Sequence, residues 1–175
     1  KCVLIMHTDP KDPEGTDLSA VCNLLGIGNN LIVSSQKVPF ENMVMAINCM
    51  DVSVNVSNNE GYGLNICESL ACGVPVIVLK TGGLTTQVTN SWNSEDVEQY
   101  GIEQYGIGLE PDVRSLVGSH PTPYIYDDRI NNHKVAGAIY DLYKIGPEKR
   151  QELGIKGRKW VERVYNIDSV VDQWH

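Results

Sequence analysis

The sequence lacks several features that would assign it to common protein classes. No apolar run approaches the roughly 20 residues of a membrane-spanning helix, and no charged-then-apolar leader stands at its start. Basic residues are in the minority, with 14 Lys and Arg against 22 Asp and Glu, so the formal net charge is -8. Because nucleic acids and phosphate-coated membranes select basic surfaces, this balance argues against both as the main partner of the chain.

The cysteines form no pattern typical of a metal site or a disulfide framework. There are five, an odd number, and they include no CxxC pair and no zinc-like Cys/His spacing: Cys2, Cys22, Cys49, Cys67 and Cys72. We interpret them as small buried hydrophobic residues in a reducing compartment. The expected location is the cytoplasm, with the cytosolic face of a membrane as an alternative for the full-length protein.

The alternation of apolar runs with amphipathic segments predicts an α/β fold. At 175 residues, with 42% hydrophobic and 21% charged side chains, the chain fits one globular domain. Strands are predicted at residues 2–6, 31–33, 52–56 and 74–79, and helices at 17–25, 39–50, 64–72, 84–88, 131–144, 147–165 and 168–174. Repeated strand–helix units of this kind predict a Rossmann-like parallel sheet with helices on both faces.

Two parts of the chain depart from this alternation. The sequence opens without methionine, directly in an apolar run, and we expect that the domain is truncated at its N-terminus. Residues 89–129 show no clear periodicity and hold several prolines and glycines, which predicts an irregular insertion on the cleft side of the sheet.

The strongest local signal lies where the third predicted strand gives way to a helix. The segment Glu60-Gly61-Tyr62-Gly63-Leu64 is a glycine-flanked turn. Ligands of open α/β sheets bind outside the carboxyl ends of the strands, and a helix N-terminus offers free N–H groups to phosphate. The turn therefore predicts a site for an anionic ligand.

Two glutamates, Glu60 and Glu68, accompany the turn with seven residues between them. A carboxylate repels phosphate but accepts hydrogen bonds from paired sugar hydroxyls. Glu68 lies in a segment that is apolar almost all round, which predicts that its charge is removed from bulk water. The alternatives are an exposed or capping acid at Glu60 and a structural ion pair at Glu68.

The stretch EGYGLNICESLACGVPV, which begins at Glu60, resembles the signature of retaining family-4 glycosyltransferases of the GT-B architecture. The shared features are the paired glutamates, the glycine-aromatic-glycine turn, the Gly-x-Pro entry to the next strand and the later Gly82-Gly83 pair. The resemblance implies the C-terminal, donor-binding half of a two-domain enzyme that transfers a hexosyl group from a nucleotide-diphosphate sugar with retention of configuration. It further implies that an N-terminal acceptor domain is missing from the chain.

The resemblance also assigns roles by position. Glu60 would act on the donor sugar at the reaction centre, and Glu68 would bind the ribose hydroxyls. The turn residues Gly61, Tyr62, Gly63 and Leu64 would contact sugar and diphosphate, Gly82 and Gly83 would border the donor, and Val38 would lie near the nucleobase, where a plain surface loop is an equal alternative. The acceptor, whether glycan, lipid or protein, is not indicated.

Other features of the sequence set limits on this assignment. The arginine and lysine that clamp the diphosphate in the family have no counterpart here, so nucleoside diphosphates are expected to bind this chain weakly. No metal or other cofactor is expected, because the histidines lack metal-ligand spacing and Asp127-Asp128 is interpreted as a solvated loop end or helix cap. The alternative functions are a nucleotide-sugar epimerase of similar architecture and a non-catalytic nucleotide-binding module.

Overall fold

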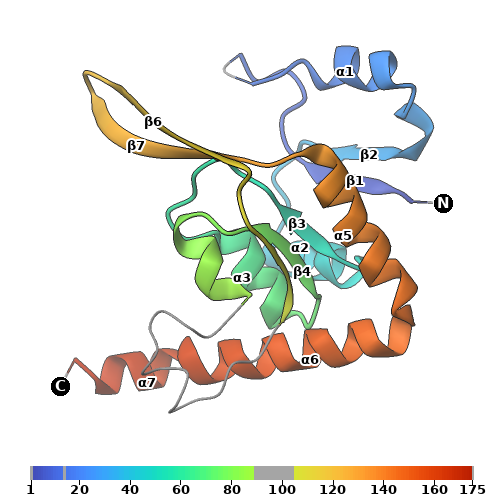
Figure 1. Cartoon of the computed structure of the whole chain (residues 1–175). Coiled ribbons are helices and arrows are strands. Elements are labelled where there is room, and N and C mark those ends of the chain that lie inside the picture. Colours follow the sequence, from blue (N-terminus) through green and yellow to red (C-terminus); the bar gives the residue numbers. More distant parts are fainter. Residues whose placement is uncertain (1, 14, 89–104, 175) are drawn as a thin grey trace. The chain divides into compact units, whose positions relative to one another are not determined.

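A computed structural model describes residues 2–13, 15–88 and 105–174, which fall into two compact units, Lys1–Asn42 and Met43–His175 (Figure 1). The first unit is a strand–helix–strand motif. Its strands β1 (Leu4–His7) and β2 (Leu31–Ser34) pair in parallel, with Leu4 opposite Leu31. Between them lie the helix α1 (Leu18–Leu25) and a short 3-10 helix, η1 (Gly28–Asn30). These elements confirm the predicted βαβ pattern of this region.

The boundaries of α1 follow from its flanking residues. The Asp17 side chain accepts a hydrogen bond from the Ala20 N–H at 3.0 Å, which satisfies one of the free donors at the start of the helix. Gly26 ends the helix with φ of 64°, in the left-handed region that favours glycine. The sequence indicates Gly26 as the end of this helix and leaves Thr16 and Asp17 as alternative caps, of which the structure shows Asp17.

The second unit is built on a three-stranded parallel sheet. In sheet order, its strands are β3 (Ser53–Asn55), β4 (Val76–Leu79) and β5 (Gly106–Leu109). Before β3, the helix α2 (Phe40–Asn48) connects the two units in sequence. Between β3 and β4 runs α3 (Leu64–Ala71), and after β4 comes a 3-10 helix, η2 (Gly82–Gln87). Since all three strands are parallel, their carboxyl ends lie at one edge of the sheet.

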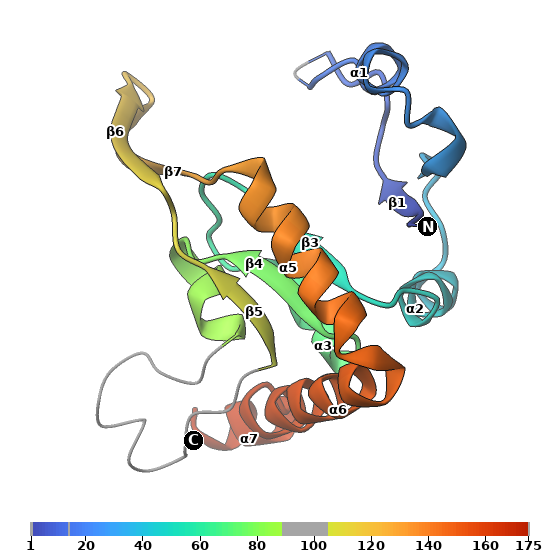
Figure 2. The same cartoon turned by 45° about the vertical axis from the view of Figure 1, so that its right-hand side comes forward.

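Helices cover both faces of this sheet (Figure 2). All four residues of β4 are buried. Val76 and Val78 pack in one hydrophobic cluster with α3 and with Trp160. Ile77, on the opposite side of the strand, packs in a second cluster with Leu142. The continuous apolar run of β4 is thus explained by burial on both faces.

Three helices form the C-terminal part of the chain, as predicted: α5 (Asn132–Lys144), α6 (Gly146–Val164) and α7 (Ile167–Asp172). Leu142 of α5 packs in the second cluster, whereas α6 contributes Trp160 to the first cluster and Leu153 to the second. Gly154 of α6 faces Gly73 so closely that a Cβ atom at Gly154 would collide with the Gly73 carbonyl. Among the described residues, no helix is long and apolar enough to cross a membrane.

The prediction of an irregular insertion at 89–129 is wrong for residues 106–129. These form β5 and an antiparallel hairpin of β6 (Val113–Ser119) and β7 (Thr122–Arg129), while residues 89–104 lie outside the described part of the chain. Gly106 was interpreted as a loop residue, but it lets β5 approach β4, because a Cβ atom there would collide with the Val76 carbonyl.

The cysteine prediction holds only in part. Cys22 is buried, Cys67 and Cys72 are partly exposed, and Cys2 and Cys49 are exposed. All five are free thiols. Burial therefore explains only some of these residues, whereas the expectation that they form no disulfide framework agrees with the structure.

Candidate functional site

The turn from Glu60 to Gly63 lies between the carboxyl end of β3 and the first residue of α3, as predicted. Glu60 is partly buried. One of its carboxylate oxygens accepts a hydrogen bond from the Tyr62 N–H at 3.4 Å, which is long for such a bond. The Glu60 carboxylate is thus held only weakly within the turn and retains most of its capacity to accept hydrogen bonds from a ligand.

Gly63 begins α3 in a conformation that favours glycine. Its φ is 87°, and its carbonyl accepts hydrogen bonds from the N–H groups of Ile66 and Cys67. No side chain in the described part of the chain caps this helix. The N–H groups of Leu64 and Asn65, which precede these bonds, and the positive end of the helix dipole are therefore available to an anion.

The loop formed by Gly82 and Gly83 packs directly on this turn. The Gly83 N–H donates a hydrogen bond to the Glu60 carbonyl at 3.2 Å. A Cβ atom at Gly83 would lie 2.5 Å from the Gly61 carbonyl oxygen and 2.6 Å from the Tyr62 Cα, and one at Gly82 would collide with the Glu60 carbonyl. The two glycine motifs that the sequence predicted as neighbours of the donor thus form one closely packed backbone unit.

The side chain of Gln87 stabilises the backbone of this unit, a role that sequence analysis did not predict. Its side chain is fully buried, and its amide nitrogen donates to the carbonyls of Tyr62 and Gly63 at 2.5 and 3.1 Å. The only sequence signal was a glutamine in the otherwise apolar and small-residue segment that follows Gly82-Gly83. Its role depends on a contact across 25 residues of sequence, which local patterns do not reveal.

Tyr62 contributes to the packing of the unit. Its ring meets that of Tyr165 edge to face, with centroids 5.6 Å apart, and its hydroxyl donates to the Cys67 sulfur at 3.4 Å. Burial, together with the hydrogen bonds to Cys67 and Tyr165, raises the pKa of Tyr62. These contacts assign the Tyr62 ring to packing within the domain rather than to stacking on a sugar.

The prediction that Glu68 is removed from water is wrong. Ile66, Ser69 and Leu70 form the buried face of α3, whereas Glu68 and Leu64 are exposed on another face, one helical turn apart. The segment is therefore amphipathic, and Glu68 needs no buried partner. The Glu68 carboxylate is accessible to solvent on the same face of α3 as Leu64, the first residue of the helix.

The hairpin begins at the same edge of the sheet. The N–H of Asp128 in β7 donates to the carbonyl of Asn58, two residues before Glu60, at 2.8 Å. The base of the hairpin therefore lies on the carboxyl side of the sheet, where the sequence placed this segment.

Asp127 and Asp128 correct another expectation. They were interpreted as a solvated loop end or a helix cap, but both are buried in β7, and each pairs with an arginine: Asp127 with Arg129 and Asp128 with Arg114. The helix cap is Asn131, whose side chain accepts from the His133 N–H. The described residues contain no group of three or more His, Cys, Asp or Glu that could hold a metal ion.

Val38 belongs to the first unit, in the connection between β2 and α2, and is partly exposed there. Glu60, Glu68 and both glycine motifs belong to the second unit. The structure therefore brings Glu60 and the two glycine motifs together and places Glu68 on the exposed face of α3. The roles assigned to these residues and to Val38 stay predictions.

A helix start beside a glycine loop at the carboxyl edge of a parallel sheet is the place where α/β proteins commonly bind anionic ligands. The chain belongs to the family of glycosyl transferases group 1, whose model matches residues 12–105. The predicted fold class, a parallel α/β sheet with helices on both faces, is confirmed.

Curated relatives and a solved structure agree with this family. The chain is similar to the D-inositol 3-phosphate glycosyltransferase of Thermomonospora curvata, with 38% identity over 97 residues, 55% of this chain and 22% of that protein. It is also 26% identical over 109 residues to the enzyme of that name from Saccharomonospora viridis, which covers 59% of this chain and 25% of that one. The fold resembles sucrose-phosphate synthase from Thermosynechococcus elongatus, with a TM-score of 0.69, 22% identity, and coverage of 98% of this chain and 36% of that one. The chain thus spans about a quarter of the length of these curated relatives.

Proposed function

We propose that this chain is the donor-binding half of a retaining glycosyltransferase that transfers a hexosyl group from a nucleotide-diphosphate sugar to an acceptor. The observation that carries the proposal is the packed unit of Glu60–Gly63 with Gly82-Gly83. In this unit a carboxylate with free acceptor capacity stands next to an uncapped helix start. A nucleotide-diphosphate sugar has a group that suits each of these features. The carboxylate can face the sugar, with its hydroxyls and its reacting carbon, and the start of α3 can bind the diphosphate.

The chemistry follows from the charges that change during transfer. Positive charge develops on the sugar as its bond to the diphosphate breaks, and a carboxylate nearby stabilises that charge. The diphosphate gains negative charge at the same time, which the N–H groups and dipole at the start of α3 stabilise. Glu60 is therefore assigned to the sugar. Glu68, which is exposed one helical turn beyond the first residue of α3, is assigned to the ribose hydroxyls.

The remaining parts of the proposal concern the whole protein. The acceptor site belongs to a second domain outside this chain, and the reaction requires no bound metal or other cofactor. The name of the curated relatives makes D-inositol 3-phosphate a reasonable first acceptor to test.

Steady-state kinetics of the intact protein test these assignments, with a panel of nucleotide-diphosphate sugars as donors. We expect Glu60→Gln to lower kcat by about 100-fold or more with little change in donor KM, since it removes charge stabilisation from the transition state. Glu68→Gln should mainly raise donor KM, by about tenfold, the scale of one charge-assisted hydrogen bond. Glu162→Gln, an exposed glutamate paired with Arg158 on α6, is the matched control and should leave both constants unchanged.

Four outcomes would contradict the proposal. Normal turnover in Glu60→Gln would remove Glu60 from the reaction centre. Loss of activity in chelator, restored by a divalent metal, would overturn the metal-free mechanism. Conversion of the donor to its epimer without any acceptor would identify an epimerase, and an inverted anomeric configuration in the NMR spectrum of the product would exclude retention.

A further inference from the structure

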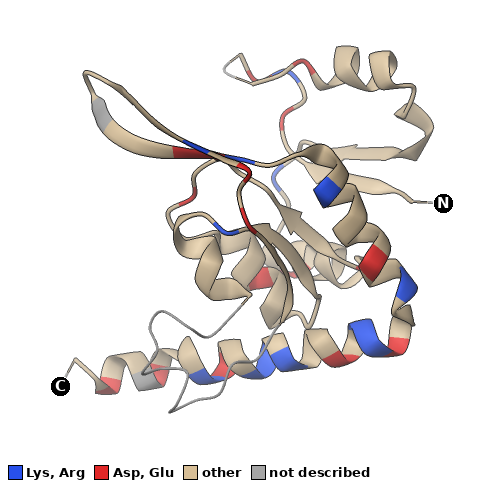
Figure 3. Cartoon of the chain, viewed as in Figure 1, with Lys and Arg blue, Asp and Glu red and all other residues tan. Residues whose placement is uncertain are grey.

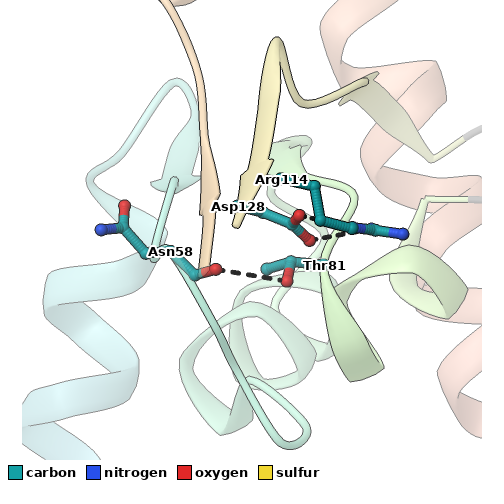
Figure 4. Close-up of polar contacts among 4 residues, drawn as sticks. All are labelled: Asn58, Thr81, Arg114 and Asp128. Atoms are coloured by element: carbon teal, nitrogen blue, oxygen red, sulfur yellow. Dashed lines mark hydrogen bonds and ion pairs between the residues drawn. The ribbon is translucent and has the colours of Figure 1, made fainter. Parts of the chain in front are cut away.

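An arginine–carboxylate pair closes the base of the β6–β7 hairpin. Arg114 and Asp128 stand directly opposite each other in the antiparallel register. The guanidinium donates twice to the carboxylate, from Nε to Oδ1 at 2.6 Å and from Nη2 to Oδ2 at 2.9 Å (Figure 4). This two-pronged geometry fixes the orientation of both side chains.

The pair reaches two segments of the candidate site through Asp128. The Asp128 N–H donates to the Asn58 carbonyl at 2.8 Å, and the Thr81 hydroxyl lies beside the Asp128 carboxylate, whose pKa it helps to lower. The same hydroxyl lies 3.4 Å from the Asn58 carbonyl (Figure 4). Asn58 precedes Glu60 by two residues, and Thr81 directly precedes Gly82. One aspartate therefore contacts the loop that leads from β3 to the Glu60 turn and lies beside the residue before the glycine loop.

Burial makes this arrangement sensitive to substitution. Asp128 is 1% exposed, so a change that removes its partners leaves a polar group away from water. The hydrogen bonds from Arg114 lower the pKa of Asp128, which keeps its carboxylate ionised at neutral pH.

A neighbouring pair of the same chemistry has no such connection. Asp127 pairs with Arg129 at 2.8 Å, and side chains of successive strand residues point to opposite faces. Among the described residues, the Asp127 side chain hydrogen-bonds to neither Asn58 nor Thr81. The chain thus offers two arginine–aspartate pairs on one hairpin, of which only one is linked to the site.

We propose that Arg114 and Asp128 are positioning residues, which hold the Glu60 turn and the Gly82-Gly83 loop in the arrangement that the transfer reaction requires. This inference rests on the role proposed for Glu60. The Arg114–Asp128 pair fixes the position of β7, whose Asp128 N–H bonds to Asn58, and the Asp128 carboxylate faces Thr81; neither side chain is assigned any contact with donor or acceptor. The hairpin is thereby a structural part of the active site.

Kinetics and amide hydrogen exchange on the intact protein test the inference, with the nucleotide-diphosphate sugar that supports the fastest turnover. Asp128→Asn preserves volume but cannot accept both bonds of the guanidinium. We expect kcat to fall by roughly 10- to 100-fold with donor KM within threefold, because small displacements of a positioned group cost this much. Amides of residues 60–63 should exchange about tenfold faster, since their local structure opens more often. Asp127→Asn is the matched control and should leave kcat and this exchange within about twofold.

Thr81 supplies a second, milder test that does not depend on how well Asp128→Asn folds. Thr81→Val removes the hydroxyl at nearly constant shape, and Thr81→Ser retains it. We expect Thr81→Val to reproduce the fall in kcat and the faster exchange at residues 60–63 in weaker form, and Thr81→Ser to restore both.

The possible results separate this inference from the proposed function. If Asp128→Asn lowers only the global stability and leaves kcat and the exchange of residues 60–63 unchanged, the pair is a structural ion pair and the inference is wrong. Equal effects in Asp127→Asn and Asp128→Asn would also overturn it. If exchange responds as expected but Glu60→Gln turns over normally, the positioning of the turn stands and the catalytic role of Glu60 fails.

Discussion

The glycine unit and the β6–β7 hairpin lie on either side of Asn58, and different kinds of contact stabilise them. In the glycine unit, residues 60–63 with 82–83, backbone packs on backbone so closely at Gly82 and Gly83 that a Cβ atom at either would collide. The hairpin is fixed at its base by charged side chains and carries no Asp, Glu, Lys or Arg between residues 115 and 126 (Figure 3). Tyr124 and Leu116 of that uncharged part are 80% and 59% exposed. The difference implies that sterics govern the site itself, whereas electrostatics govern its connection to the hairpin.

The largest effect is expected at Gly83, where the glycine unit has no space. Gly83→Ala places a Cβ atom 2.5 Å from the Gly61 carbonyl oxygen, so two backbone segments must separate. We expect the free energy of unfolding to fall by about 3 kcal/mol, the upper range for overpacked sites, and donor turnover to be lost. Urea unfolding and steady-state kinetics would measure the two effects.

Gly137→Ala is the control for this substitution. Gly137 lies within α5, and nothing stands within 4 Å of the position where its Cβ would be. Alanine should therefore raise the stability by roughly 0.5–1 kcal/mol through its higher helix propensity. If the Gly83→Ala protein were as stable and active as the wild type, the backbone around Gly83 would accommodate a Cβ atom at little cost. The claim that steric packing governs the glycine unit would then be wrong.

A smaller effect is expected at Gln87, the side-chain support of the glycine unit. Gln87→Leu fills the same space but withdraws the donor from the Tyr62 and Gly63 carbonyls. The Gly63 carbonyl still accepts from two N–H groups of α3, so the main loss is at Tyr62. We expect a destabilisation of about 1–2 kcal/mol, the cost of one unsatisfied buried acceptor. Gln151→Leu, at an exposed position of α6, should change stability by less than about 0.5 kcal/mol in the same urea titration.

The sequence predicted the parts of this molecule that depend on neighbouring residues. Gly26 and Gly73 end helices with positive φ, Asp17 caps α1, and the glycine-flanked turn lies at Gly63 where it was predicted; all of these follow from local conformational rules. The predicted strand at residues 74–79 is likewise present as β4. Family-level resemblance then placed Glu60 and Gly82-Gly83 in one site, and the structure brings them together.

The missed features depend on partners that are distant in sequence. Gly106 looks like a loop residue until β4 is placed beside it, and Asp128 looks like a loop acid until β6 presents Arg114. Glu68 was misjudged for a related reason, because the burial of one face of α3 is set by the sheet and by α6. Local periodicity cannot supply these pairings, since they are fixed only when the chain folds.

The smallest effect is expected from acid, and it should act on the hairpin rather than on the glycine unit. Because its hydrogen bonds to Arg114 lower the pKa of Asp128 in the folded protein, the ionised carboxylate contributes stability above its unfolded pKa of about 4. That contribution is lost as the pH falls through the lower pKa of the folded state. Asp128→Asn cannot titrate, so the difference in unfolding free energy between wild type and this variant should shrink between about pH 6 and about pH 2. Gly83→Ala carries no titrating group, and its difference from wild type should stay constant over the same range. Urea unfolding of the three proteins at several pH values measures both differences. If the difference in unfolding free energy between wild type and Asp128→Asn stays constant or widens in acid, the pair with Arg114 does not stabilise the ionised form of Asp128. The claim that electrostatics govern the connection of the hairpin to the site would then be wrong.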